Sequence, residues 1–256
     1  MNDFMICGAL LYDGTGHPPY PADVAVTESR VAAVAPAGKL HRTGFREIRA
    51  EGLSLSPGFI DAHGHSDVSI LAAPEASGKI SQGVTTEITG NCGLSAFPVL
   101  TDEVREHLDN LYAAYHVPIT WNTLDDYATE LNRREPAINI ASLCGHNTLR
   151  ANISGYGGRT LAAAELNRMA ELLGQALHQG AAGLSTGLLY TPGRFADTAE
   201  LLHLMSVLKK FDRLYATHLR SEGDQLTEAL EEAVFLAKNG PRKLQASQLK
   251  TALPRN

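Results

Sequence analysis

The sequence predicts an α/β protein built on a parallel sheet and preceded by a small β domain. From residue 53 onward, short apolar segments alternate with longer helical stretches, which is typical of parallel strands joined by right-handed crossovers. The pattern fits an incomplete (β/α)8 TIM barrel with about six of its eight strand-helix units, and it also fits an open doubly wound sheet. Residues 1–55 instead show short strands between turns, so we expect domains at 1–55 and 56–256.

The N-terminal segment is predicted to hold three short apolar strands, at residues 5–11, 22–26 and 31–34. Gly, Asp and Ser residues between them mark turns. Nothing in this segment suggests chemistry, so we expect its role to be structural.

In the second domain, the apolar runs predict strands at 53–63, 83–89, 138–143, 181–184, 214–217 and 244–247. Because Phe59 and Ile60 continue an apolar run, the first of these is expected to be buried. The intervening segments predict helices at 73–82, 101–134 (broken near Pro118), 160–179, 197–211 and 225–239.

Composition narrows the class of protein. The 256 residues are 44% hydrophobic and 20% charged, as in an ordinary globular protein. A net charge of −6 gives no basic footprint for nucleic acid. The three widely spaced cysteines, Cys7, Cys92 and Cys144, argue against a disulfide framework. Without a basic leader or an apolar run of about 20 residues, we expect no signal peptide, no membrane span and a cytoplasmic location.

Candidate metal ligands follow the predicted strands, at the rim where both candidate folds place their chemistry. His63 and His65 follow the first strand, and residues i and i+2 of a strand share a face, so both imidazoles can aim at one point. Gly64 between them leaves room for a backbone or a substrate. Cys92 ends the second strand and His218 the fifth. Imidazole and thiolate are good zinc ligands, although a pair of surface histidines in a Gly-rich loop remains an alternative.

Other polar residues near the same rim receive lesser roles. We expect His146 to support the site from a second layer, and Cys7 and Cys144 to be structural. Arg220 and Glu222 are expected to form an ion pair with each other at the rim.

Four segments resemble one enzyme family: 57–67 (PGFIDAHGHSD), 83–93 (GVTTEITGNCG), 183–193 (GLSTGLLYTPG) and 217–222 (THLRSE). They are similar to the N-acyl-D-amino-acid deacylases, or D-aminoacylases, of the metal-dependent amidohydrolase superfamily. The resemblance implies a metal-bearing TIM barrel and a small β-sandwich, of which residues 1–55 would be the N-terminal half. It also implies zinc-dependent hydrolysis of the amide of an N-acyl-D-amino acid, a small molecule, to a carboxylate and a D-amino acid.

The resemblance also implies roles for single residues. Cys92 and His218 would hold a tight zinc ion, and His63 with His65 a second, weaker one. Tyr190 and Lys250 resemble substrate-binding residues of the family.

Two departures from the family matter for function. Gln248 stands where the family has a histidine, and an amide oxygen is a poorer zinc donor, so the tight site should be weakened. The chain ends before the family's strand-eight aspartate, the general base, and Asp61 and Asp67 are poor substitutes. We therefore expect this chain, as a fragment or a truncated product, to be inactive alone and to need a complementing C-terminal segment or self-association.

Three other readings of the function stay open. One is a different amidohydrolase, dihydroorotase-like or hydantoinase-like, although no counterpart of their bridging lysine is found in strand four. The second is a non-catalytic fragment, and the third is a metal-binding protein without turnover.

Overall fold

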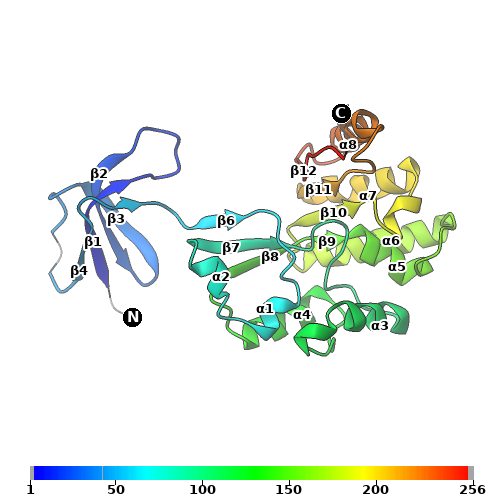
Figure 1. Cartoon of the computed structure of the whole chain (residues 1–256), viewed down its shortest axis with the longest axis horizontal. Coiled ribbons are helices and arrows are strands. Elements are labelled where there is room, and N and C mark those ends of the chain that lie inside the picture. The colour runs from blue at the N-terminus through cyan, green and yellow to red at the C-terminus, as the bar shows by residue number, and fades with distance from the viewer. Residues whose placement is uncertain (1–2, 42, 253–256) are drawn as a thin grey trace. The chain divides into compact units, whose positions relative to one another are not determined.

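The computed structural model of the protein describes residues 3–41 and 43–252. The chain divides into two compact units, Met1–Phe59 and Ile60–Asn256 (Figure 1). Within the described residues, no helix combines the length and the apolar character that crossing a membrane requires.

The first unit is a five-stranded sheet in the order β3-β2-β1-β4, with β5 also paired to β1. Its strands are β1 (Phe4–Leu11), β2 (Tyr20–Thr27), β3 (Arg30–Pro36), β4 (Arg46–Arg49) and β5 (Ser54–Leu55). Strands β1, β2 and β3 pair antiparallel, whereas β4 and β5 run parallel to β1. The sequence did not predict β4, because all four of its residues are exposed and it lacks the apolar alternation of a half-buried strand.

The second unit contains two β-sheets, one of three and one of four strands, and within each sheet the strands follow one another in space as in sequence. They are β6 (Phe59–Asp61), β7 (Val84–Thr89), β8 (Asn139–Ser142), β9 (Cys144–Gly145), β10 (Gly183–Gly187), β11 (Leu214–His218) and β12 (Leu244–Ser247). The orders are β6-β7-β8 and β9-β10-β11-β12, and β8 and β9 are consecutive pieces around Leu143. Strand β7 is parallel to β8, and β9 to β12 are parallel to one another. A doubly wound sheet would reverse its strand order at a switch point, and neither sheet does. The predicted barrel-type fold is therefore confirmed.

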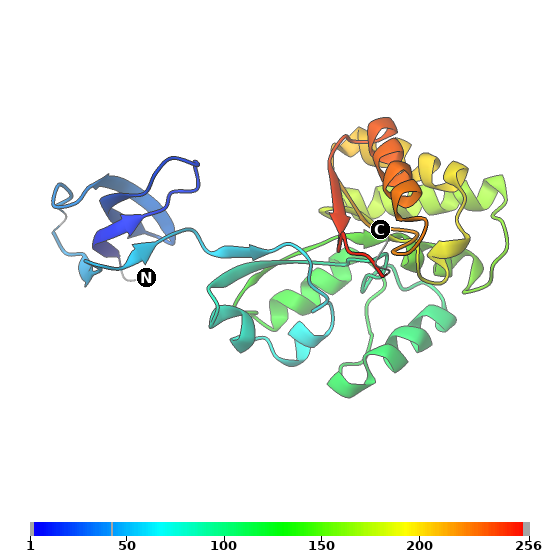
Figure 2. The ribbon, with the colours of Figure 1, turned by 45° about the horizontal axis from the view of Figure 1, so that its top comes forward.

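Helices connect the strands and lie along the outer side of the sheet (Figures 1 and 2). They are α1 (Ser69–Ala72), α2 (Ser77–Ile80), α3 (Asp102–Leu111), α4 (Leu124–Arg133), α5 (His146–Ser154), α6 (Ala163–His178), α7 (Thr198–Phe211) and α8 (Leu226–Asn239), with 3-10 turns at Ala113–Tyr115 and Gly193–Phe195. The predicted helix at 73–82 is reduced to the single turn α2, and a second single turn, α1, lies before the predicted range. Helix α5 was missed because its first six residues are all buried, which erases the amphipathic stripe.

The first predicted strand, 53–63, is wrong in two respects. The Pro57-Gly58 kink divides it, so that β5 joins the first unit and β6 joins the barrel sheet. Phe59 and Ile60 are 61% and 64% exposed rather than buried. The reason is that β6 lies at an edge of the described sheet, with β7 as its neighbour.

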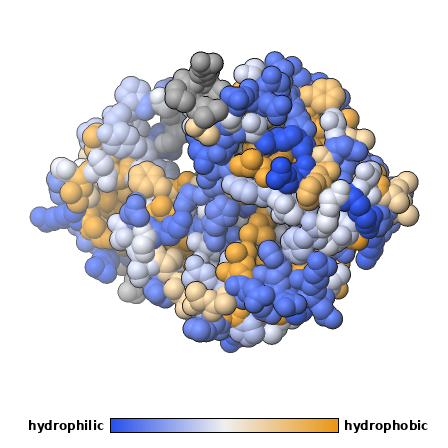
Figure 3. Space-filling view, turned by 45° about the vertical axis from the view of Figure 1, so that its right-hand side comes forward, coloured by the Kyte–Doolittle hydropathy of each residue, from blue (hydrophilic) through white to orange (hydrophobic). Residues whose placement is uncertain are grey.

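The core of the second unit contains a buried charged cluster as well as apolar side chains. The face drawn in Figure 3 is mostly hydrophilic, with separate apolar patches. Inside, Glu200 Oε1 on α7 lies 2.8 Å from His146 Nε2 and 3.2 Å from Arg150 Nε. Arg150 is fully buried and also donates to the carbonyl oxygens of Gly157 and Arg159. This cluster ties α5 to α7 and to the loop after α5.

Two glycines allow the strand ends to pack closely. Gly90 has φ of +74°, and a Cβ there would lie 2.1 Å from the Leu143 carbonyl oxygen. At Gly187, the end of β10, a Cβ would lie 1.9 Å from the Cys92 carbonyl oxygen. Real side chains cannot fit at such distances, so these glycines let the turn after β7 rest directly on its neighbours.

We predict that Glu200→Gln destabilises the second unit by about 3 kcal/mol, because it leaves Arg150 as an unpaired buried charge. Fluorescence of Trp121, the one tryptophan of the chain, should report this in a urea titration. The control is Glu171→Gln, whose partner Arg168 and own side chain are 58% and 66% exposed, and which should cost less than about 0.5 kcal/mol. Equal effects of the two variants would contradict the prediction.

We also predict that Gly187→Ala destabilises the same unit by about 1–3 kcal/mol or more, since the added methyl meets backbone atoms of Cys92. The matched control is Gly174→Ala within α6, where the nearest atom to a Cβ is 4.0 Å away. That change should stabilise by about 0.5–1 kcal/mol. The same titration measures both, and a neutral Gly187→Ala would show that the turn is not packed as described.

Candidate metal centre

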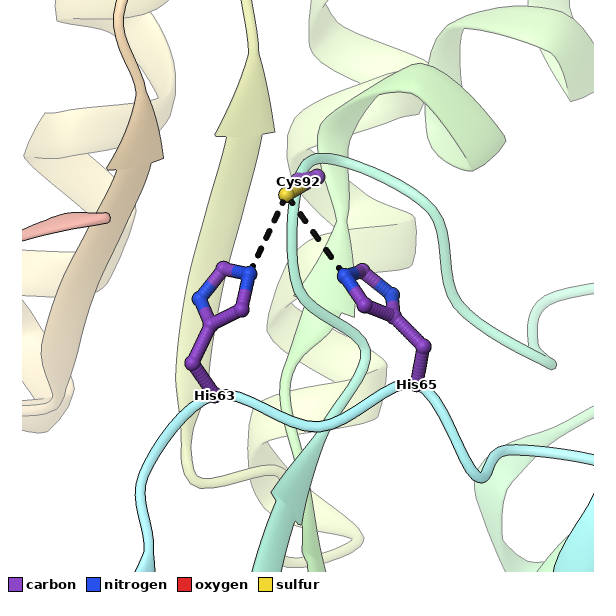
Figure 4. A group of neighbouring side chains, drawn as sticks. All are labelled: His63, His65 and Cys92. Atoms are coloured by element: carbon purple, nitrogen blue, oxygen red, sulfur yellow. Dashed lines mark hydrogen bonds between the residues drawn. The ribbon is translucent and has the colours of Figure 1, made fainter. Parts of the chain in front are cut away.

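Four side chains meet at the carboxyl ends of the strands. His63 and His65 lie in the loop after β6, Cys92 in the turn after β7, and His218 at the end of β11. The Cys92 Sγ is 3.4 Å from His63 Nε2, 3.7 Å from His65 Nε2 and 3.6 Å from His218 Nδ1. Figure 4 shows both loop imidazoles pointing at this sulfur. The donor atoms of His63, His65 and Cys92 all lie within 4.8 Å of one another, and His218 joins them through Cys92.

The loop carrying the two histidines is held against the end of β7. Gly64 N donates to Ile88 O at 2.9 Å, Ser66 N donates to Glu87 Oε1 at 3.2 Å, and Asn91 Nδ2 donates to Gly64 O at 3.3 Å. A Cβ on Gly64 would lie 1.8 Å from Glu87 Oε1. The space that we expected Gly64 to leave for a backbone or a substrate is thus filled by the buried Glu87.

A left-handed backbone conformation orients the side chain of Cys92. Its φ is +55°, between Gly90 and Gly93 at +74° and +76°, and left-handed backbone is uncommon outside glycine. Gly93 N donates to Ser185 Oγ on β10 at 3.0 Å. The tight turn therefore presents the thiol to the histidines from a fixed position.

Burial sets the protonation of these groups. It is the main cause that lowers the pKa of His63, His65 and His218, which favours the neutral imidazoles that bind metals. Burial also raises the pKa of Cys92 to about 11, so the thiol needs a cation nearby to become a thiolate. In addition, His63 Nδ1 is buried without a hydrogen-bond partner.

The expected pairing of Arg220 with Glu222 is wrong. Arg220 instead pairs with Glu232 on α8, Nε to Oε2 2.9 Å. Glu222 Oε1 lies 2.7 Å from His218 Nε2 and 3.3 Å from Lys250 Nζ. The sequence did not predict these pairs, because a segment with alternating charges such as Arg-Ser-Glu is equally compatible with an exposed turn.

The predicted substrate residues lie around His218. The Tyr190 hydroxyl is 3.4 Å from both ring nitrogens of His218, and the two rings are 4.7 Å apart. Lys250 reaches the same group through Glu222. Gln248 has φ of +54° and lines a pocket beside Cys92.

Two other expectations concern supporting groups. His146 does not form a second layer around the metal ligands, because its Nε2 pairs with Glu200 in the core. Asp61 pairs with Lys79, and this hydrogen bond is the main cause that lowers the pKa of Asp61. Asp67 is 2% exposed, and burial raises its pKa to about 7.

A pocket of about 350 Å³ opens beside the cluster, with His65, Cys92, Tyr190 and Gln248 among its lining residues. Sequence reasoning missed the rest of its wall, which includes residues of α3 and α5: Val104, His107, Leu108, Leu111, Asn147 and Thr148. Nothing in the pattern of α3 distinguishes it from a helix that only covers the barrel.

Known proteins resemble this chain in sequence and in fold. The chain is 39% identical over 255 residues to the N-acyl-D-aspartate deacylase of Alcaligenes xylosoxydans xylosoxydans, which covers 99% of this chain and 50% of that protein. It matches the crystal structure of N-acyl-D-glutamate deacylase from Bordetella bronchiseptica, complexed with zinc and a phosphonate inhibitor, with a TM-score of 0.89, 35% identity and coverage of 100% and 53%. A structure of D-aminoacylase with a binuclear metal centre matches with a TM-score of 0.83, 36% identity and coverage of 93% and 50%.

The chain thus spans about half the length of the relatives it matches. The model of the amidohydrolase family matches residues 46–239, a range that contains all four clustered side chains. On this match, together with the parallel barrel strands and the histidine–cysteine cluster at their carboxyl ends, the chain belongs to the amidohydrolase family.

Proposed function

We propose that this chain carries the metal-binding part of a zinc-dependent N-acyl-D-amino-acid deacylase. The reaction is hydrolysis of the amide of an N-acyl-D-amino acid to a carboxylate and a D-amino acid. The observation that carries the proposal is the meeting of His63, His65 and His218 around the single sulfur of Cys92. The names of the relatives support the substrate class.

The residues present fit zinc. Nitrogen and sulfur are its preferred protein donors, and the imidazoles here favour their neutral, ligating form. We assign Cys92 and His218 Nδ1 to a tight position, weakened by Gln248, and His63 with His65 to a weaker one. Since its sulfur contacts all three imidazoles, Cys92 is placed to serve both positions.

Zinc, when bound, supplies a polarised substrate carbonyl and an acidified water. Around it, the Glu222 carboxylate lies 2.7 Å from His218 Nε2, where it would hold the imidazole with Nδ1 facing Cys92. The Lys250 ammonium, 56% exposed, would bind the substrate carboxylate. The Tyr190 hydroxyl would hydrogen-bond the reacting amide at the mouth of the pocket.

Neither of the two aspartates beside the histidine pair is free to act as the general base. Asp61 is occupied by Lys79 and Asp67 is buried, so neither can take a proton from water. We propose that the base comes from a complementing segment equivalent to the second half of the relatives. Self-association of the chain is the alternative way to pair its edge strands. The edge strands β6 and β12 would receive that segment, and their ends already approach each other, with Gln245 Nε2 donating to Ala62 O at 3.0 Å.

The proposal predicts that the zinc-loaded chain alone does not hydrolyse N-acetyl-D-methionine. Mixed with the second half of the N-acyl-D-aspartate deacylase, it should release D-methionine, as measured with a D-amino-acid oxidase assay, and Cys92→Ala should abolish the release. Turnover by the chain alone would refute the need for a complementing segment. A mixture that forms a stable zinc-loaded complex without turnover would refute the function.

A zinc titration against a chromophoric chelator should separate two contributions to metal affinity. Gln248→His supplies an imidazole donor and should raise the affinity at least about tenfold, or about 1.4 kcal/mol. Glu222→Gln removes the charge behind His218 and should lower it about 10–100-fold. Two controls should leave the zinc affinity unchanged. Gln82→His adds an imidazole at an exposed position after α2, and Glu232→Gln removes the charge that pairs with Arg220. An unchanged affinity in Gln248→His would contradict the assignment of the tight position.

A further inference from the structure

We propose that the pocket beside the cluster binds the N-acyl chain of the substrate and prefers an apolar chain of several carbons over acetyl. This inference rests on the proposed function, and it names which arm of the substrate the pocket accepts.

Apolar side chains form much of the pocket wall, alongside the uncharged polar residues Asn147, Thr148 and Thr191. The apolar part consists of Leu94, Val104, Leu108, Leu111 and Pro192, together with the ring of Tyr156. Among the described residues that line it, none is Asp, Glu, Lys or Arg. His107 faces the pocket, but its ring packs 4.5 Å from that of Tyr156. An acidic side chain, such as that of D-aspartate or D-glutamate, would therefore find no strong cation there, whereas a hydrocarbon chain would leave water for apolar surface.

The position of Lys250 gives the direction of the substrate. An amide bond has two arms, and Lys250, which we assign to the carboxylate of the D-amino acid, is not among the pocket's lining residues. It lies instead beside Glu222, on the Nε2 side of His218. With the scissile carbonyl at Cys92, the amino-acid arm points toward Lys250. The acyl arm then enters the pocket under α3.

The pocket is too large for an acetyl group to fill it. Its volume is about 350 Å³, whereas one water molecule occupies about 30 Å³ of liquid and a methylene group is of similar size. An acetyl methyl would leave most of the pocket to water. Each additional buried methylene should tighten binding about fourfold until the wall at α3 is reached.

The test uses the carboxylate products as probes, so that it does not depend on turnover. Acetate, butanoate and hexanoate are titrated calorimetrically into the zinc-loaded chain, and hexanoate should bind at least about tenfold more tightly than acetate. Leu111→Asn, at a position 48% exposed, should reduce the preference for hexanoate at least about threefold and leave acetate unchanged. Leu100→Asn, 45% exposed and outside the pocket, is the matched control and should leave both unchanged.

Several outcomes would overturn the subsite. Hexanoate binding no tighter than acetate, including no binding of either, would do so. The subsite would also be overturned if affinity rose from D-alanine to D-norleucine but did not rise from acetate to hexanoate. The pocket would then hold the amino-acid side chain. If hexanoate is preferred but the complemented chain hydrolyses no N-acyl-D-amino acid, the pocket stands and the proposed function fails.

Discussion

The architecture of the site depends on the hydrogen bonds that fasten the His-x-His loop to the end of β7. Strand β6 is three residues long and exposed, so it cannot position two imidazoles by its own packing. Gly64, Ser66 and Asn91 supply the missing restraint by bonding the loop to β7 and to the turn that holds Cys92. The histidine pair and the cysteine consequently behave as one rigid piece, in which Glu87 fills the space under the loop.

The opposite side of the cluster is joined to this piece through β10. Gly187 packs against the Cys92 carbonyl and is in register with His218 on β11. This one glycine therefore fixes the position of Cys92 relative to His218. The result concentrates neutral nitrogen donors and one high-pKa thiol, with the Glu222 carboxylate behind His218. A divalent cation is the ligand that satisfies such a group of lone pairs, and binding it would also restrain the loop, the turn and the strand relative to one another.

Sequence reasoning reached the parts of the structure that follow from periodicity and strand order. The alternation of apolar runs and helices predicted the barrel-type sheet, and strand-end placement brought His63, His65, Cys92 and His218 to one rim; their role as ligands stays a prediction. Single contacts across the fold were out of reach. Glu222 lies against His218 and Lys250 rather than Arg220, and His146 pairs with Glu200. These pairings depend on where the helices pack in the fold, which no local sequence pattern encodes. Helix α5 was hidden by its complete burial.

The central claim is that zinc binds this chain through the Cys92 sulfur together with imidazole nitrogens. X-ray absorption at the zinc K-edge on the purified, zinc-loaded chain measures this directly. The expected spectrum contains a sulfur shell near ~2.3 Å and a nitrogen or oxygen shell at about 2.0–2.1 Å, and Cys92→Ser should remove the sulfur shell alone. A wild-type spectrum that lacks the sulfur shell would contradict the claim.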